Sequence, residues 1–168
     1  MRPAKLKSLA RLSRIVREEK KRGRRVVLAN GCFDLIHAGH IRYLRHCKTA
    51  GDVLVVALNS DASTRRLKGP GRPLLPEDER AEILSAFDFV DYVTIFEENN
   101  VENILRTLRP DVHAKGSDYS VDTVPERAVV REYGGEIFIA GGPKIRSTSE
   151  VIRSIEAAGR RAGGHGNR

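Results

Sequence analysis

Two histidines three residues apart, His37 and His40, stand in the segment NGCFDLIHAGH at residues 30–40. If a helix begins directly after His37, both imidazoles project toward one point, where they can donate hydrogen bonds to the charge that builds up on a phosphorus centre. The start of a helix adds unpaired backbone N–H groups and a positive dipole end, which attract phosphate. Gly31 and Gly39 allow the backbone to approach a bulky anion. The segment therefore predicts phosphate chemistry.

Other interpretations of the histidines are weaker. A pair at this spacing also suits a structural role or a zinc site, with Cys32 or Asp34 as a third ligand. The longer pattern Gly-x-Phe-Asp-x-x-His-x-Gly-His is more specific than the pair, and it favours phosphate over zinc. Residues 69–71 lack the third glycine of a dinucleotide-binding turn, and residues 141–147 lack the spacing of a P-loop. We expect no metal site built from protein ligands.

These residues need elements that hold them together, and the apolar pattern indicates them. Five apolar runs alternate with helical patterns, which predicts an α/β fold, a single domain with a doubly wound five-stranded parallel sheet. We expect strands at 25–30, 52–58, 92–96, 112–115 and 136–140. We expect helices at 39–50, from Pro76, at 101–108, at 125–133 and from Thr148, and a loop at 59–75. Ligands of such sheets bind beyond the carboxyl ends of the strands.

The basic charge is concentrated at the two ends of the chain. The net charge is +8, whereas residues 26–159 alone sum to −4. We expect a basic amphipathic helix within 1–24, a catalytic domain at 25–158 and a flexible basic tail at 159–168. The acidic body argues against a nucleic-acid-binding module, which is the remote alternative.

The sequence also predicts where the protein works. The longest apolar run, residues 53–58, is far below the length of a membrane span. The first 25 residues lack the apolar core of an export signal, and Cys32 and Cys47 are too few for a disulfide framework. We therefore expect a cytoplasmic protein that does not bind membranes.

On the segment at 30–40, the sequence resembles the nucleotidyltransferase superfamily, whose members join a nucleoside monophosphate to a phosphorylated partner and release pyrophosphate. Its Phe33-Asp34 form is similar to the cytidylyltransferase-like branch, and the resemblance implies a Rossmann-like nucleotidyltransferase fold. Further segments, together with this one, resemble the D-glycero-beta-D-manno-heptose 1-phosphate adenylyltransferases over about residues 8–157: 59–63, 66–69, 72–73, 79–80 and 115–119.

That resemblance implies transfer of AMP from ATP to D-glycero-D-manno-heptose 1-phosphate, which forms ADP-heptose for lipopolysaccharide. It also implies the stand-alone form without a kinase half, and relatives suggest a homodimer. Mg²⁺ is expected to bind mainly through the triphosphate. The open alternative is cytidylyl or guanylyl transfer to glycerol 3-phosphate or another small phosphorylated alcohol or heptose.

The resemblance implies a role for each matching residue. His37 and His40 are expected to stabilise the transferring phosphoryl group, and Lys68 to act with them from a loop that closes over the phosphates. The expected nucleotide-binding residues are Asn30, Gly31, Cys32, Phe33, Asp34, Gly39, Arg72, Arg80, Lys115, Gly116, Asp118, Ser147, Thr148 and Ser149. The expected sugar-binding residues are Asn59, Asp61 and Tyr119. By spacing alone, residues 147–150 form a helix-capping box, and the roles of Lys144 and Arg146 stay open.

Overall fold

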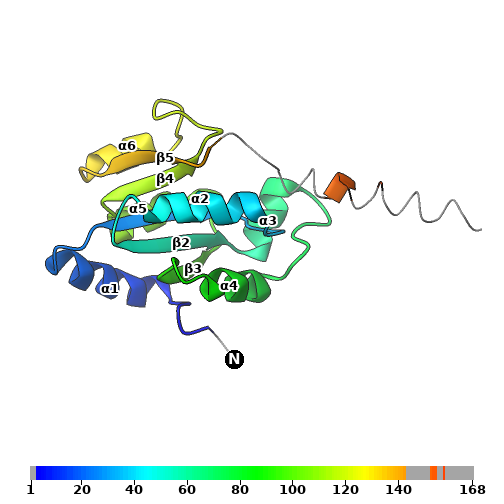
Figure 1. Ribbon diagram of the computed structural model, residues 1–168, viewed down its shortest axis with the longest axis horizontal. Helices are drawn as coiled ribbons and strands as arrows, with labels where there is room; N and C mark the ends of the chain where they lie inside the picture. The colour runs from blue at the N-terminus through cyan, green and yellow to red at the C-terminus, as the bar shows by residue number, and fades with distance from the viewer. Residues whose placement is uncertain (1–2, 143–151, 155–156, 158–168) are drawn as a thin grey trace, which may run out of the picture.

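The computed structural model describes residues 3–142, 152–154 and 157, and within them five strands form one parallel sheet in the order β3-β2-β1-β4-β5. The strands are β1 (Val26–Gly31), β2 (Val53–Asn59), β3 (Tyr92–Phe96), β4 (Val112–Gly116) and β5 (Glu136–Ala140). The helices are α1 (Leu9–Lys21), α2 (Ala38–Lys48), α3 (Asp61–Lys68), α4 (Glu77–Ala86), α5 (Glu102–Leu108) and α6 (Arg127–Glu132). The predicted doubly wound α/β fold is confirmed (Figure 1).

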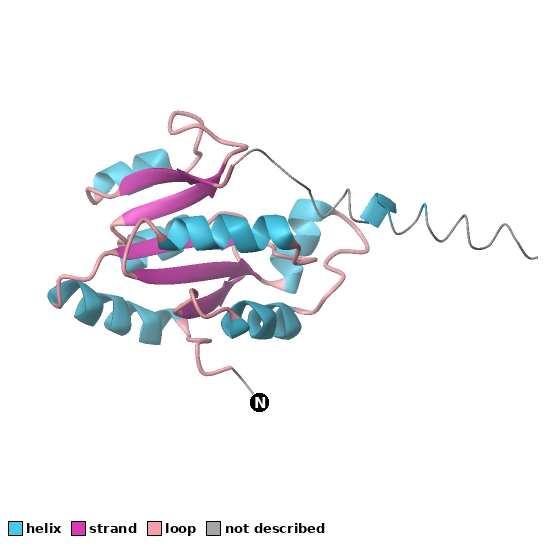
Figure 2. Cartoon of the chain, viewed as in Figure 1, coloured by secondary structure: helices cyan, strands magenta, loops and turns pink. Residues whose placement is uncertain are grey.

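Helices cover both faces of the sheet, as Figure 2 shows. Leu44 of α2 and Leu84 of α4 pack on one face. Leu12 of α1, Leu105 of α5 and Val130 of α6 pack on the other. Strand β2 is apolar up to its last residue, Asn59, because both faces of the strand are buried, and every one of its residues is buried.

The register of the sheet fixes where the functional segments meet. Asn30 lies beside Ala57, and Gly31 lies beside Leu58. The carboxyl ends of β1 and β2 therefore lie side by side, and the loop that leaves β1 starts next to the helix that follows β2. This edge carries the segments in which the sequence predicted chemistry.

The prediction of a loop at 59–75 is wrong, because residues 61–68 form α3. Ser60 caps this helix by accepting a hydrogen bond from the backbone N–H of Ser63 at 3.1 Å, and Gly69 ends it with a positive φ of 94°. The buried residues of α3 are the polar Ser63 and Thr64. The helix therefore has no apolar stripe for a sequence pattern to detect.

The predicted amphipathic helix is present as α1, and it belongs to the same core as the sheet. Leu12 and Val16 are fully buried against the strands. The segment before α1 pairs with β3, since Lys7 N–H donates to the Val93 carbonyl at 2.9 Å and Val93 N–H donates to the Lys5 carbonyl at 3.0 Å. In the described part of the chain, no helix combines the length and the hydropathy that a bilayer crossing requires.

Candidate active site

His37 stands at the point where the loop after β1 enters α2. It is the N-cap residue, with φ −135° and ψ 171°, and its Nδ1 accepts a hydrogen bond from Gly39 N–H at 3.1 Å. Because Nδ1 accepts, the neutral ring carries its proton on Nε2. The capping bond thus fixes both the ring and the position of its N–H donor.

His40 lies directly beside this ring. The two imidazoles stack with centroids 4.0 Å apart and planes 25° apart. Burial, followed by the charges of His37 and Lys68, lowers the pKa of His40 to about 4. His40 is therefore neutral near pH 7. Lys68, expected in a loop, is the last residue of helix α3, and its charge acts on His40.

Phe33 supports the second histidine from the loop. Its backbone has a φ of 45°, and its ring meets the His40 ring edge-on, with centroids 5.3 Å apart. A Cβ on Gly31 would lie 3.1 Å from the Phe33 ring. The structure therefore gives Gly31 a packing role, since its missing side chain makes room for the ring that contacts His40.

Asp34 binds the segment between α3 and α4 to the loop that follows β1. Its side chain is buried, and Oδ1 accepts hydrogen bonds from the N–H groups of Leu74 at 2.5 Å and Leu75 at 3.4 Å. Its Oδ2 lies 3.0 Å from Arg72 Nη1, as an ion pair without the alignment of a hydrogen bond. Asp34 and Arg72, both expected to contact the nucleotide, are thus paired with each other.

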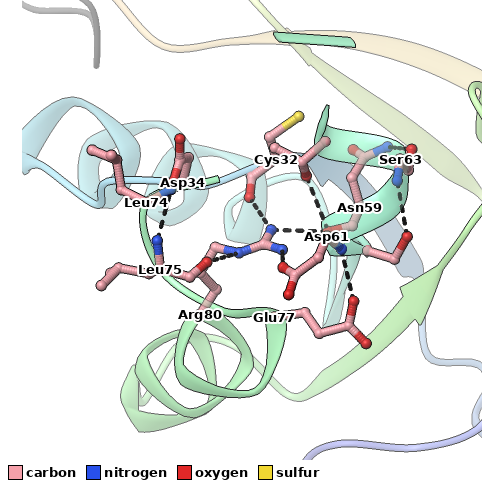
Figure 3. Close-up of polar contacts among 11 residues, drawn as sticks. Cys32, Asp34, Asn59, Asp61, Ser63, Leu74, Leu75, Glu77 and Arg80 are labelled. Carbon is pink, nitrogen blue, oxygen red and sulfur yellow. Dashed lines mark hydrogen bonds and ion pairs between the residues drawn. The ribbon is translucent and has the colours of Figure 1, made fainter. Parts of the chain in front are cut away.

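Arg80 is placed differently from the expected phosphate contact, because its side chain is fully buried. Its Nη1 donates to the carbonyls of Cys32 at 2.6 Å and Asn59 at 2.9 Å. Its Nε donates to the Leu75 carbonyl at 2.9 Å, and its Nη2 pairs with Asp61 Oδ1 at 2.6 Å (Figure 3). These partners come from β2, from the segments that follow β1 and β2, and from the segment before α4. The guanidinium joins them from inside the protein.

The two polar residues expected to bind the sugar belong to the same network. Asn59 is buried and donates from Nδ2 to Ser63 Oγ at 2.9 Å. Asp61 accepts from Arg80, and its own backbone N–H donates to Glu77 Oε2 at 2.7 Å. In Figure 3 the Asp61 carboxylate faces the Arg80 guanidinium, whereas the Asn59 side chain faces Ser63.

Strand β4 carries a second set of polar residues, and the sequence predicted only some of them. His113 is fully buried, and its Nε2 lies 3.2 Å from Asn30 Oδ1. Burial, with Lys115 as a second cause, lowers the pKa of His113 to about 3. A histidine between the apolar residues Val112 and Ala114 was the available sequence signal. It orients the amide of Asn30, which was an expected nucleotide contact.

Lys115 lies on the same face of β4, two residues further on. Its Nζ lies 3.3 Å and 3.4 Å from the carboxylate oxygens of Glu126, and 5.0 Å from the centre of the Tyr119 ring. Lys115 and Glu126 are both buried, and Tyr119 is 39% exposed. Glu126 was absent from the expected site, because at the start of a helix it has the sequence context of an ordinary acidic first turn.

Three further expected residues lie in or directly after elements of this edge. Gly39 is in the first turn of α2, Gly116 ends β4, and Asp118 follows it. Ser147, Thr148, Ser149 and the neighbouring Lys144 and Arg146 lie outside the described residues. Within the described ranges, no three His, Cys, Asp or Glu residues gather in a way that would hold a metal ion.

Comparisons with known proteins identify the family of the chain. Residues 28–155 match the protein-family model described as cytidylyltransferase-like. The bifunctional protein HldE of Geobacter sulfurreducens is 50% identical over 152 residues, which cover 90% of this chain and 31% of that protein. The HldE protein of Geotalea uraniireducens is also 50% identical over 152 residues, with the same coverage. The chain thus spans about a third of the length of these curated relatives.

A solved structure adds a likeness in three dimensions. The lipopolysaccharide core biosynthesis protein from Thermoplasma volcanium superposes with a TM-score of 0.62 and 28% sequence identity. The match covers 71% of this chain and 99% of that one. The shared part is therefore nearly the whole of that smaller protein.

Proposed function

This chain belongs to the cytidylyltransferase-like family, and from that premise we propose that it transfers AMP from ATP to D-glycero-D-manno-heptose 1-phosphate. The products are ADP-heptose and pyrophosphate. The observation that carries the proposal is the stacked pair of imidazoles, His37 and His40, at the start of α2. The similarity to the HldE proteins and the resemblance of residues 115–119 to heptose 1-phosphate adenylyltransferases support the choice of substrates.

The reaction needs no general base. A sugar phosphate has its second pKa near 6 and is mostly a dianion at neutral pH, so one of its oxygens attacks the α-phosphorus of ATP directly. The new O–P bond forms as the bond from the α-phosphorus to the bridging oxygen breaks, and pyrophosphate leaves with the electron pair. The protein must align two anions that repel each other and stabilise the charge of the transition state.

The histidines are suited to that task. His37 presents Nε2–H because its Nδ1 is occupied by Gly39, and the neutral His40 lies beside it. Two donors held by a capping bond and by ring packing need little reorganisation when the transition state forms. Lys68 supplies a positive charge next to them, for the oxygens of the leaving pyrophosphate.

The other contacts follow the order of the strands. The nucleotide is proposed to lie over β1, β4 and β5, and the sugar phosphate over the end of β2, near Asn59 and Asp61. Arg72 and the serine and threonine residues at 147–149 remain proposed phosphate contacts. Tyr119 remains a proposed sugar contact, and the homodimer remains an expectation that light scattering tests.

We expect Mg²⁺ to enter this site as an ion carried by the triphosphate. Asp34 is the buried carboxylate nearest to the histidines in sequence, and both of its oxygens already face Arg72, Leu74 and Leu75. Bound Mg²⁺ neutralises part of the triphosphate charge, and phosphate oxygens with water are its usual ligands in such sites. The protein groups align the phosphates.

Pyrophosphate release tests the substrates. The purified chain is incubated with heptose 1-phosphate or glycerol 3-phosphate and with each of ATP, CTP and GTP. We expect turnover with ATP and heptose 1-phosphate, and none after His37 and His40 are both replaced by alanine. His46→Asn is the matched control on the same helix, because asparagine keeps an acceptor for the Gly141 N–H that His46 binds at 2.9 Å. Turnover with CTP and glycerol 3-phosphate but not with ATP would contradict the proposal.

A further inference from the structure

We propose that Glu126 is a positioning residue: its carboxylate holds the ammonium of Lys115 at the carboxyl end of β4, where that ammonium binds a phosphoryl oxygen of ATP. The inference rests on the proposed function, because it takes the bound nucleotide to be a triphosphate. It goes beyond that function by giving a role to Glu126, whose carboxylate pairs with the ammonium of Lys115.

The ion pair of Lys115 and Glu126 is buried, but the distances between its nitrogen and oxygen atoms are long. The side chains of Lys115 and Glu126 are 10% and 6% exposed, and Nζ lies 3.3 Å and 3.4 Å from the two carboxylate oxygens. Charge-assisted hydrogen bonds between such groups are ordinarily about 2.7–2.9 Å long. Oε2 of Glu126 has no hydrogen-bond partner within the described chain. The ammonium is thus held mainly by charge, and a second anion can share it.

Stability of the fold is a poor explanation for this arrangement. Removing two charges from water costs about as much free energy as their attraction returns, so a buried ion pair adds little net stability. Without Glu126, however, a buried ammonium would have no counter-charge, and the flexible side chain would turn toward solvent. Glu126 therefore determines where the charge of Lys115 lies before substrate binds.

The other neighbours of the ammonium leave it able to bind an anion. A lysine ammonium has three N–H donors, and the face of the Tyr119 ring lies 5.0 Å from Nζ. His113, on the same face of β4, is neutral at physiological pH because burial holds its pKa near 3. Lys115 is therefore the cation of this group and Glu126 its anion, and a phosphate with a larger negative charge competes well for the free donor.

The strand order indicates which substrate supplies the phosphate. β4 lies between β1, which leads to His37 and His40, and β5, which leads toward residues 147–149. Two of the three expected sugar contacts, Asn59 at the end of β2 and Asp61 at the start of α3, lie on the far side of β1. The position of Lys115 therefore favours the triphosphate over the sugar phosphate.

Equilibrium binding of ATP tests the inference without requiring turnover. Calorimetry of Glu126→Gln should give a Kd for ATP about tenfold higher than that of the unchanged chain, equivalent to about 1.4 kcal/mol. In the transfer assay, the KM for ATP should rise by a similar factor, while kcat and the KM for the sugar phosphate change by less than about threefold. Glu126→Asp, which keeps the charge, should restore most of the affinity.

A double-mutant cycle separates positioning from general damage. Lys115→Met should weaken ATP binding, and adding Glu126→Gln to it should have no further effect, because the ammonium to be positioned is gone. Glu132→Gln, which changes a surface glutamate of α6 paired with Arg106, is the matched control and should bind ATP normally. Thermal melting checks that each variant folds.

The outcomes are distinguishable from a failure of the proposed function. An unchanged ATP affinity in Glu126→Gln, or an equal loss with and without Lys115, overturns the role of Glu126. A chain that binds ATP with this dependence but transfers nothing to heptose 1-phosphate keeps the inference and loses the proposed substrate. A chain that binds no ATP overturns both.

Discussion

The ring of His40 stacks on that of His37, with 4.0 Å between their centroids. The two side chains are held by different means, His37 by the capping bond to Gly39 and His40 by burial against Phe33. Both rings therefore lie together at the start of α2, and the consequences for catalysis depend on whether they act separately or as one unit.

We predict that they act as one unit. His37→Ala and His40→Ala should each lower kcat for pyrophosphate release by about 100-fold or more, because a preorganised donor is lost from the transition state. The double variant should have a kcat only slightly lower than that of either single variant, since each ring supports the other. Rapid-quench measurement of the single turnover checks this, with His46→Asn as control. Strictly multiplicative losses would show that the rings work independently.

Acid should destabilise the fold through its buried histidines. The pKa of His113 is lowered by burial from 6.5 to about 3, so between these values the unfolded chain binds a proton that the folded chain does not. Stability must therefore fall as the pH falls through this window, and His40 adds to the loss between 6.5 and about 4. In His113→Gln, the free energy of unfolding should depend less steeply on pH, by up to about 1.4 kcal/mol per pH unit.

Urea unfolding at intervals between about pH 7.5 and 4.5 measures this slope. Glutamine keeps a donor for Asn30 Oδ1, so the variant removes the titrating group while retaining the contact. If the free energy of unfolding depends on pH with the same slope in the variant and in the unchanged chain, His113 does not cause the acid sensitivity.

The parts of this fold that could be predicted are those in which the signal is local. Strands β3 and β5 have the bounds that their apolar runs indicated, 92–96 and 136–140. The histidines could be found because one short segment contains both of them and the glycines around them. Helix α3 was missed because its buried residues are Ser63 and Thr64. Their hydroxyl groups donate hydrogen bonds to the carbonyls of Glu98 and Asn59.

The supports of the site could not be predicted, because their partners are distant in the sequence. Arg80 binds Cys32 across 48 positions and Asn59 across 21. An arginine in the first turn of an acidic helix has the same sequence context whether it faces solvent or the interior. Only the packing of α4 against the sheet, with Ala81 and Leu84 in the core, turns this arginine inward.

Replacement of Arg80 should therefore damage the fold first and the chemistry second. Arg80→Met leaves the Asp61 carboxylate and the carbonyls of Cys32 and Asn59 without their donor. We expect a loss of about 3 kcal/mol or more in the free energy of unfolding, because several backbone carbonyls inside the protein lose their donor at once.

Arg80→Lys should recover only part of this loss, because an ammonium lacks the planar fork that reaches several oxygens at once. Arg65→Met, at an exposed position of α3, is the control and should stay within about 0.5 kcal/mol. Urea unfolding gives the values. A stable Arg80→Met with a raised KM for ATP would instead support the original expectation of a phosphate contact.

Residues 69–75 form a strap that Asp34 holds against the loop after β1. Asp34→Ala removes the acceptor of the Leu74 and Leu75 N–H groups and the partner of Arg72. We expect the amides of Leu74 and Leu75 to exchange hydrogen about tenfold faster or more, because their protection depends on opening of this segment alone. Hydrogen exchange followed by NMR or mass spectrometry measures these exchange rates.

Amides of the buried strand β2 serve as the internal reference, and Asp122→Ala, on an exposed loop, serves as the control variant. Equal acceleration in β2 would mean that Asp34 stabilises the whole domain, whereas unchanged exchange at both leucines would mean that the strap is held without it.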